Sequence, residues 1–201
     1  MVRGAPRRTP WWAWLATERL LIACTLLAVM PGSAAPAESA VAPLLKPLDL
    51  VGYASRIATP HFIGGTIDTR RISTMDLRGK VVLVNFWATW CAECRPEMPM
   101  LEELHRDFAP QGLVVIGVNA REQKEAIRLY AGGLGLSFPL VLDPEGKITA
   151  LYGVVGVPTT FLVGRDGRAV AFAVGPRAWA SPAARALIRA LLSEPAPADA
   201  R

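Results

Sequence analysis

The chain has 201 residues, which is enough for one domain with terminal extensions. Its formal net charge is +5, but residues 1–37 contain four arginines and one glutamate, which leaves 18 basic and 16 acidic residues in the remainder. With a net charge of only +2 outside this segment, the chain lacks the basic excess that is typical of nucleic-acid-binding proteins.

Residues 1–37 have the organisation of an export signal: a basic stretch, the apolar segment Leu20–Met30, and small residues that end at Ala37, after which cleavage is expected. The alternative is an uncleaved membrane anchor, because the apolar residues from position 11 onward approach the length that spans a bilayer. Glu18 and Arg19 interrupt that stretch, which favours a cleaved signal. We therefore expect a periplasmic or other extracytoplasmic protein, with anchoring to the inner membrane as the alternative.

Residues 31–47 are rich in Ala, Pro and Ser and show little periodicity, which predicts a flexible spacer, and the linker before the domain is expected at residues 38–57. One domain is expected over residues 58–192. Its central strand should be Val81–Ala88, a continuous apolar run typical of a strand that is buried on both faces. The segment Glu97–Phe108 has apolar residues at helical spacing, and Pro99 within it predicts a kink.

Similar patterns continue along the domain. A second apolar strand, Leu113–Val118, precedes a helix, Glu122–Ala131, that Gly132 and Gly133 should end. This alternation of strands and helices implies parallel strands joined by crossover helices. Shorter elements follow: a strand at Phe138–Leu142, a helical turn at Lys147–Tyr152, a hairpin of Thr159–Val163 with Arg168–Val174, and a helix at Ser181–Leu192. Residues 193–201 are expected to be a disordered tail.

Two of the three cysteines form the motif Cys91-Ala92-Glu93-Cys94 directly after the central strand. Cys24 lies inside the predicted signal and would be absent from the exported domain. One close pair cannot tie together a domain of this size, so the motif is more typical of redox chemistry than of a structural disulfide.

The start of a helix suits a redox cysteine, because unpaired backbone N–H groups and the positive end of the helix dipole stabilise a thiolate. Since Cys91 follows the strand, we expect the helix to begin near it and to expose its sulfur. Cys94 would lie one helical turn further on. We therefore predict that Cys91 is the attacking nucleophile and Cys94 the buried thiol that resolves the mixed disulfide.

The same two sulfurs could also bind a metal. A zinc site needs two further Cys or His ligands, and His61 and His105 lack the spacing of a zinc motif. No metal site and no bound cofactor is therefore predicted, and the redox group is the Cys91–Cys94 disulfide itself. A Cu(I)-binding protein is the non-enzymatic alternative.

The segment VVLVNFWATWCAECRPEMP resembles the active-site segment of the exported TlpA/ResA-type thioredoxin-like (redoxin) proteins. The similarity continues through GLVVIGVN, YGVVGVPTTFLV and the Asp166-Gly167 turn, and so covers residues 58–192. It implies an α/β thioredoxin fold, with a central mixed β-sheet flanked by helices and an N-terminal family extension. It also implies an enzyme that exchanges thiols and disulfides with exported proteins, apocytochrome c among them, and that receives electrons from a membrane thiol carrier.

The resemblance assigns further site residues. Val157-Pro158-Thr159 matches the cis-proline loop that faces the cysteines in this family, where Val157 would offer its backbone to an extended substrate strand. An ordinary trans proline before a strand is the alternative. Glu97 matches a glutamate that lies near the cysteines, where a partly buried carboxylate can accept the proton of Cys94. Its alternative is a surface carboxylate in the first turn of a helix.

The residues around the cysteines bear on the direction of electron flow. Trp90 is expected to shield the sulfurs and to contact the substrate, and Trp87 either shares this role or belongs to the core. Ala92 and Glu93 replace the proline-containing dipeptides common in the family, which leaves the redox potential open. The charge of Glu93 disfavours a thiolate and would make the protein more reducing, unless it is simply a solvated loop charge.

These residues together predict a thiol–disulfide oxidoreductase that reduces disulfides in exported proteins. A dedicated reductant has a distinct task in the periplasm, because that compartment is otherwise oxidising. The alternatives are a disulfide-forming or isomerising oxidant and a Cu(I)-binding thiol chaperone. A thiol peroxidase would share the fold, but its reactive cysteine normally follows a Pro and Thr pattern that this chain lacks.

Overall fold

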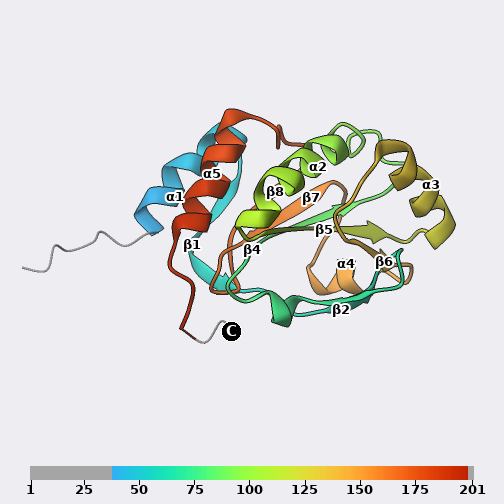
Figure 1. Ribbon diagram of the computed structural model, residues 1–201, viewed down its shortest axis with the longest axis horizontal. Coiled ribbons are helices and arrows are strands. Elements are labelled where there is room, and N and C mark those ends of the chain that lie inside the picture. The colour runs from blue at the N-terminus through green and yellow to red at the C-terminus, as the bar shows by residue number, and fades with distance from the viewer. Residues whose placement is uncertain (1–37, 199–201) are drawn as a thin grey trace, which may run out of the picture. The chain divides into compact units, whose positions relative to one another are not determined.

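A computed structural model describes residues 38–198 of the chain. At its centre is a six-stranded sheet with the strand order β1-β8-β7-β4-β5-β6 (Figure 1). Strands β4 (Val81–Trp87), β5 (Leu113–Ala120) and β6 (Leu140–Asp143) are parallel, whereas β7 (Thr159–Val163), β8 (Arg168–Val174) and β1 (Val51–Ala58) run antiparallel to their neighbours. The predicted mixed central sheet is therefore confirmed.

Helices cover both faces of the sheet. The larger core cluster includes residues of α1 (Glu38–Leu45), α2 (Glu97–Phe108), α3 (Lys124–Leu134) and α5 (Pro182–Ser193), and the smaller cluster includes α4 (Lys147–Leu151). Figure 1 shows α1, α2 and α5 on one side of the sheet and α4 on the other. A small second sheet pairs β2 (Ile63–Gly65) with β3 (Arg71–Ser73), and short 3₁₀ helices lie at η2 (Lys46–Leu48), η3 (Thr74–Leu77) and η4 (Ala109–Gln111). Between residues 38 and 198, no helix is long and apolar enough to cross a membrane.

Strand β4 is buried along its whole length because both faces of the sheet are covered at this point. Successive side chains of a strand point to opposite faces, so apolar residues are needed on both sides. Val81, Leu83 and Trp87 belong to the larger cluster, and Val82, Val84 and Phe86 to the smaller one. Asn85 is also buried, and its amide Nδ2 donates to Thr160 Oγ1 of β7 at 2.9 Å. This rigid strand leads directly into the segment that carries the cysteines.

Residues 38–57 do not form the predicted linker. They contain α1, η2 and all but the last residue of β1, which pairs with β8. Val41 and Leu45, one helical turn apart in α1, are buried in the larger core cluster. The prediction is wrong because Pro43 and the alanines concealed this helical spacing. The sequence of β1 did not predict a strand either, because its side chains are mostly exposed and do not alternate between buried and exposed positions.

Helix α3 extends beyond its predicted end. It continues through Gly132 and Gly133 to Leu134, and Gly135 then caps it with a left-handed φ of 63°. Glycine in a helix interior costs only about 0.5–1 kcal/mol relative to alanine. Burial of Ile127 on the inner face of α3 offsets such a cost, so the two glycines did not stop the helix.

The C-terminal tail begins later than predicted. Ser193 is the last residue of α5, and Glu194 after it is buried and forms an ion pair with Arg56 of β1. The carbonyl of Glu194 also accepts a hydrogen bond from Arg165 Nη1 at 2.8 Å. The chain therefore remains ordered beyond the end of α5, because the ion pair with Arg56 holds Glu194 in place. Residues 199–201 lie outside the described residues, as do residues 1–37 with the predicted signal and Cys24.

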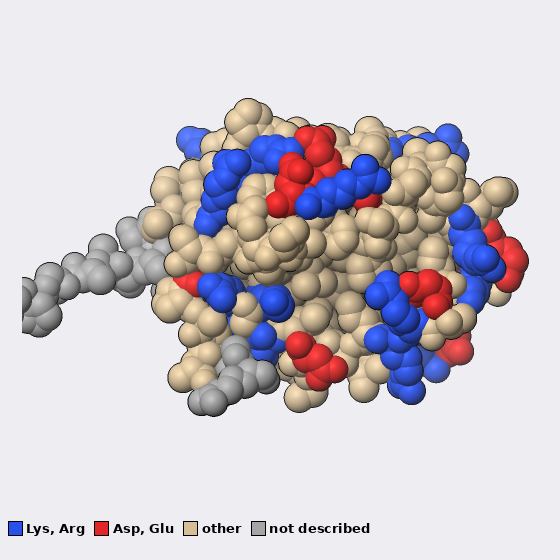
Figure 2. Space-filling model, viewed as in Figure 1, with Lys and Arg blue, Asp and Glu red and all other residues tan. Residues whose placement is uncertain are grey.

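Acidic and basic side chains are interspersed on the face that α2 and α5 present in Figure 2. On this face Arg185 of α5 forms ion pairs with both Glu103 and Asp107 of α2. Exposed pairs of this kind contribute little to stability, typically about 0–1 kcal/mol. The mixed pattern agrees with the small net charge outside residues 1–37.

Gly117 of β5 lies where the sheet has no room for a side chain. A Cβ atom there would come within 2.8 Å of Leu140 Cδ2 and 2.9 Å of Trp87 Nε1. We expect Gly117→Ala to lower the free energy of unfolding by about 1–3 kcal/mol, since overpacking forces neighbours from their positions. Urea denaturation measures this change. Gly133→Ala is the matched control, because its Cβ meets no atom within 4 Å, and it should stabilise by up to about 1 kcal/mol; equal effects of the two substitutions would contradict the prediction.

Candidate active site

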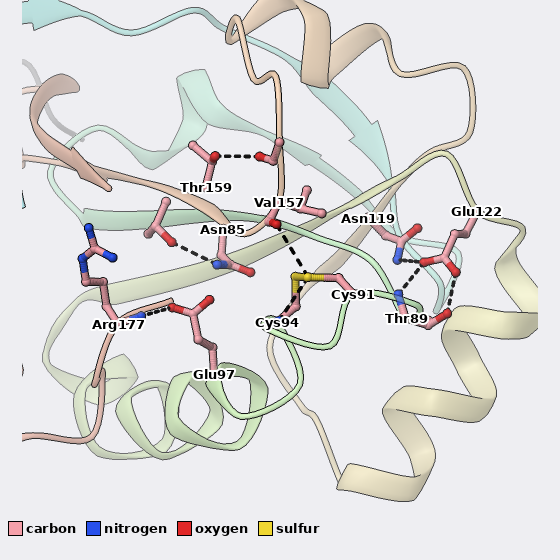
Figure 3. The surroundings of a disulfide bond; sticks show 12 residues. Asn85, Thr89, Cys91, Cys94, Glu97, Asn119, Glu122, Val157, Thr159 and Arg177 are labelled. Carbon is pink, nitrogen blue, oxygen red and sulfur yellow. Dashed lines mark hydrogen bonds between the residues drawn. A yellow bond between two sulfur atoms is a disulfide. The ribbon is translucent and has the colours of Figure 1, made fainter. Parts of the chain in front are cut away.

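Cys91 and Cys94 form a disulfide in the segment between β4 and α2, with their Cα atoms 5.3 Å apart (Figure 3). The chain turns after β4, and the backbone N–H of Cys91 donates to the carbonyl of Ala88. Cys91 exposes 6% of its surface and Cys94 only 1%. Both cysteines are therefore buried in the disulfide form, and Cys91, whose sulfur was predicted to be exposed, is the less buried of the two.

Helix α2 does not begin at Cys91, as the sequence predicted, but at Glu97. Residues 91–96 form successive turns, in which Cys94 N donates to Cys91 O and Glu97 N to Cys94 O. The backbone N–H of Cys94 instead donates to Cys91 Sγ, with the nitrogen 3.1 Å from the sulfur. This donor is placed to stabilise a Cys91 thiolate locally, because hydrogen bonding to the charged form favours it.

The later start of α2 also changes the role of Pro99. Pro99 is the third residue of the helix, where a backbone N–H would have no partner within the helix in any case. The proline therefore removes no hydrogen bond from the helix interior, and the physical basis of the predicted kink is absent.

Glu97 is fully buried at the start of α2. Its Oε1 accepts two hydrogen bonds, from the backbone N–H of Arg177 and from the indole Nε1 of Trp179, both at 2.7 Å. Arg177 and Trp179 lie in the segment between β8 and α5. The second oxygen, Oε2, makes no hydrogen bond within the described residues, and Figure 3 shows the Asn85 amide pointing toward this carboxyl. Glu97 is thus a buried carboxyl rather than the surface carboxylate that was the alternative.

Burial raises the pKa of Glu97 to about 7. The hydrogen bonds from Arg177 and Trp179, the charge of Arg177 and the Asn85 amide all act in the opposite direction, but burial outweighs them. Glu97 therefore changes charge near neutral pH, where a carboxyl can both accept and return a proton.

The loop before β7 contacts the disulfide at Cys91. The Val157–Pro158 peptide bond is cis, and the Val157 carbonyl oxygen lies 3.7 Å from Cys91 Sγ. Thr159 supports the loop, because its hydroxyl donates to the carbonyl of Gly156 at 2.7 Å. Of the residues predicted from the family resemblance, Val157 contacts Cys91, Pro158 follows it through the cis bond, and Thr159 supports the loop from further away.

The two tryptophans before the motif differ in their surroundings. Trp87 is fully buried in the larger core cluster, whereas Trp90 is 67% exposed beside Cys91 in the chain. Trp90 is therefore available to a partner, and Trp87 is a core residue. Ala92 and Glu93 are both exposed between the cysteines.

Residues 57–171 match the AhpC/TSA family. The chain belongs to the AhpC/TSA family. The thiol-disulfide oxidoreductase ResA of Bacillus anthracis is 37% identical over 116 residues, which are 58% of this chain and 67% of that protein. ResA of Bacillus subtilis is 36% identical over 116 residues, 58% of this chain and 65% of that protein. This AhpC/TSA-family member is thus a ResA/TlpA-type redoxin and a thiol–disulfide oxidoreductase.

Solved structures confirm the thioredoxin fold of this redoxin. A thiol:disulfide interchange protein of the thioredoxin family from Chlorobium tepidum has a TM-score of 0.62 and 29% identity, and the match covers 70% of this chain and 99% of that chain. A DsbF homologue from Corynebacterium diphtheriae has a TM-score of 0.61 and 27% identity, with coverage of 72% and 92%. The fold of this chain is therefore shared with a known thiol:disulfide interchange protein of the thioredoxin family.

Sequence reasoning missed several residues that support the redoxin site. Arg177 and Trp179 lie 80 and 82 residues from Glu97 along the chain. No sequence motif near either residue indicates that it bonds to Glu97. Glu122 was also missed, although it follows the end of β5, which is parallel to β4. Carboxyl ends of parallel strands meet at one edge of a sheet, so this position was a detectable signal.

Proposed function

We propose that this redoxin reduces disulfides in other exported proteins. The observation that supports this proposal most directly is the Cys91–Cys94 disulfide, whose less buried cysteine, Cys91, lies beside the Val157 carbonyl. In the reduced protein, the Cys91 thiolate attacks a substrate disulfide, forms a mixed disulfide and releases one substrate thiolate. Cys94 then attacks Cys91 Sγ, which restores the intramolecular disulfide and releases the second substrate thiol. Two electrons pass from the protein to the substrate.

Glu97 supplies the proton acceptor in this proposal. Cys94 must lose its proton before it attacks, and its surroundings exclude water because only 1% of its surface is exposed. A buried carboxyl with a pKa of about 7 can take that proton at neutral pH and return it in the reductive half of the cycle. The Asn85 amide, which points toward the carboxyl in Figure 3, lowers its pKa and so favours its ionised form.

The substrate surface consists of Trp90 and the loop that contains Val157, Pro158 and Thr159. An extended segment of the partner would pair with the Val157 backbone, while its side chains contact the exposed ring of Trp90. The reductive direction is supported by Glu93, whose negative charge between the cysteines disfavours the thiolate and so favours the oxidised form of this protein. A redox potential near the oxidising end of the thioredoxin-like range would instead favour a disulfide-forming enzyme.

The proposed site of action is extracytoplasmic, because the composition of residues 1–37 is that of an export signal or membrane anchor. We include apocytochrome c among the proposed substrates and a membrane thiol carrier as the electron donor, on the strength of the resemblance to the TlpA/ResA-type proteins. No bound cofactor takes part in this scheme, since the dithiol itself carries the electrons.

Trapping of the mixed disulfide tests the proposal. A Cys94→Ser variant keeps the nucleophile but cannot resolve the intermediate, so it should accumulate protein adducts that a reducing agent releases. The Cys91→Ser/Cys94→Ser double variant is the matched control and should capture none. The adducts are compared on reducing and non-reducing gels and then identified. Captured proteins that lack paired cysteines would contradict the reductase function.

A further inference from the structure

Glu122 connects two segments that meet at the redox site. It lies in the turn between β5 and α3, and its carboxylate accepts three hydrogen bonds. Oε2 accepts from the backbone N–H of Thr89 and from Asn119 Nδ2, both at 2.7 Å, and Oε1 accepts from the Thr89 hydroxyl. Figure 3 shows Glu122 between Asn119 and Thr89. Thr89 precedes Cys91 by two residues. One carboxylate therefore connects the segment that contains the cysteines to Asn119 at the end of β5.

This arrangement does not serve the helix that follows Glu122. The N-cap of α3 is Gln123, and it makes no capping hydrogen bond through its side chain. The preceding residue, Arg121, has a left-handed φ of 65°, which is uncommon outside glycine. Such strained backbone persists where the surroundings hold it in place and is concentrated at functional sites. The turn therefore directs Glu122 across to Thr89.

We propose that Glu122 is a positioning residue for protein substrates, an inference that rests on the proposed function. Its hydrogen bonds fix both hydrogen-bond donors of Thr89, the backbone N–H and the hydroxyl, and the next two residues are the exposed Trp90 and the nucleophile Cys91. The orientation of this segment sets the gap between Trp90 and the Val157 loop. A bulky partner needs that gap in a fixed geometry, whereas a small disulfide needs only access to Cys91 Sγ.

Two substitutions at this position separate geometry from charge. In Glu122→Gln, the amide oxygen can keep the bonds from Thr89 N and Asn119 Nδ2, and the amide nitrogen can donate to the Thr89 hydroxyl once that hydroxyl rotates. The network then survives without the charge. In Glu122→Ala all three hydrogen bonds are lost. Glu125→Ala is the matched control, because Glu125 is an exposed glutamate in the first turn of α3.

The reduced proteins are tested on two probes by stopped-flow kinetics. The first is a synthetic peptide with one Cys-Xaa-Xaa-Cys disulfide, and the second is the small disulfide dithiobis(nitrobenzoate). Glu122→Ala should react with the peptide about tenfold more slowly, the scale of loss that misplaced groups cause, and with the small disulfide at the wild-type rate. Glu122→Gln and Glu125→Ala should match the wild type on both. Equal slowing on both probes, or no slowing on either, would overturn the inference.

Amide hydrogen exchange gives a readout that does not depend on any substrate. The Thr89 amide should be protected in the wild type and in Glu122→Gln, and should exchange at least tenfold faster in Glu122→Ala. Thr89→Val, which replaces the hydroxyl by a methyl group, should keep the protection of the backbone amide at this position and lose part of the peptide rate. If the wild type reacts with the small disulfide but not with the peptide, the proposed function fails. The exchange rate of the Thr89 amide in the variants then decides whether Glu122 positions this segment. Identical exchange in all variants would overturn it.

Discussion

The free energy of unfolding should fall by roughly 3 kcal/mol between about pH 4.5 and pH 7 through Glu97 alone. In the folded protein, burial keeps this carboxyl protonated up to a pKa of about 7, whereas its ordinary value is 4.5. Within this window unfolding releases a proton, so rising pH favours the unfolded chain. The stabilising contribution is complete below pH 4.5 and is lost as the pH passes through 7.

Urea denaturation of the oxidised protein at intervals from pH 4 to pH 8 measures this effect. Glu97→Gln is the reference, because its amide stays neutral and its Oε1 can still accept from Arg177 and Trp179. The difference between the two proteins isolates the titration of Glu97, and the disulfide keeps Cys91 and Cys94 from titrating. The wild type should lose stability relative to the variant as the pH rises. A difference that stays flat across this range would contradict the raised pKa.

Replacing Trp179 by alanine should lower the free energy of unfolding by about 3–5 kcal/mol. The indole is fully buried in the larger core cluster, so its removal leaves a cavity and takes away one of the two donors to Glu97 Oε1. Urea denaturation at a fixed pH measures the loss. A cost below about 1 kcal/mol would contradict this role, because it is less than the cost of most large-to-small core substitutions.

Trp179→Phe separates the hydrogen bond from the packing. Phenylalanine retains much of the ring volume but has no N–H, so Glu97 keeps only the donor from Arg177. The cost should be about 1–3 kcal/mol at pH 8, where the carboxyl is ionised and needs its donors, and smaller at pH 5, where it is neutral. The pKa of Glu97 should rise further in this variant. Equal costs at the two pH values would exclude a contribution from the indole–carboxylate bond.

Sequence reasoning was accurate where the signal was local. The apolar run of β4 was predicted almost to the residue, and the helical spacing of Glu97–Phe108 in α2 was recognised although its start was expected near Cys91, because both elements bury regular patterns of side chains. The hairpin of β7 and β8 followed from its Asp-Gly turn. These elements alone place the cysteines after the carboxyl end of β4, between a buried strand and an amphipathic helix.

Several of the errors concern contacts between distant parts of the chain, and others concern local backbone conformation. Helix α1 and strand β1 are held by α5 and β8 rather than by their own patterns. The burial of Glu97 depends on Arg177 and Trp179, which no motif connects to it. The segment from Cys91 to Pro96 forms turns instead of a helix start, and the resemblance to known redoxins concerned residue types rather than backbone conformation. Spacing can identify reactive groups, but only the folded chain shows their environment.

The way in which the sheet ends has a consequence for solubility. On one side, the pairing of β1 with β8 is interrupted by a bulge between Gly52 and Ile57. On the other side, β6 is covered by a bridge between Thr66 and Val141 and by the hydrogen bond from Ile67 N to Leu140 O. Bulged and covered edges are poor templates for unwanted strand addition. In the proposed function the protein receives extended segments of other proteins, and sheet edges of this kind disfavour unwanted pairing with such segments.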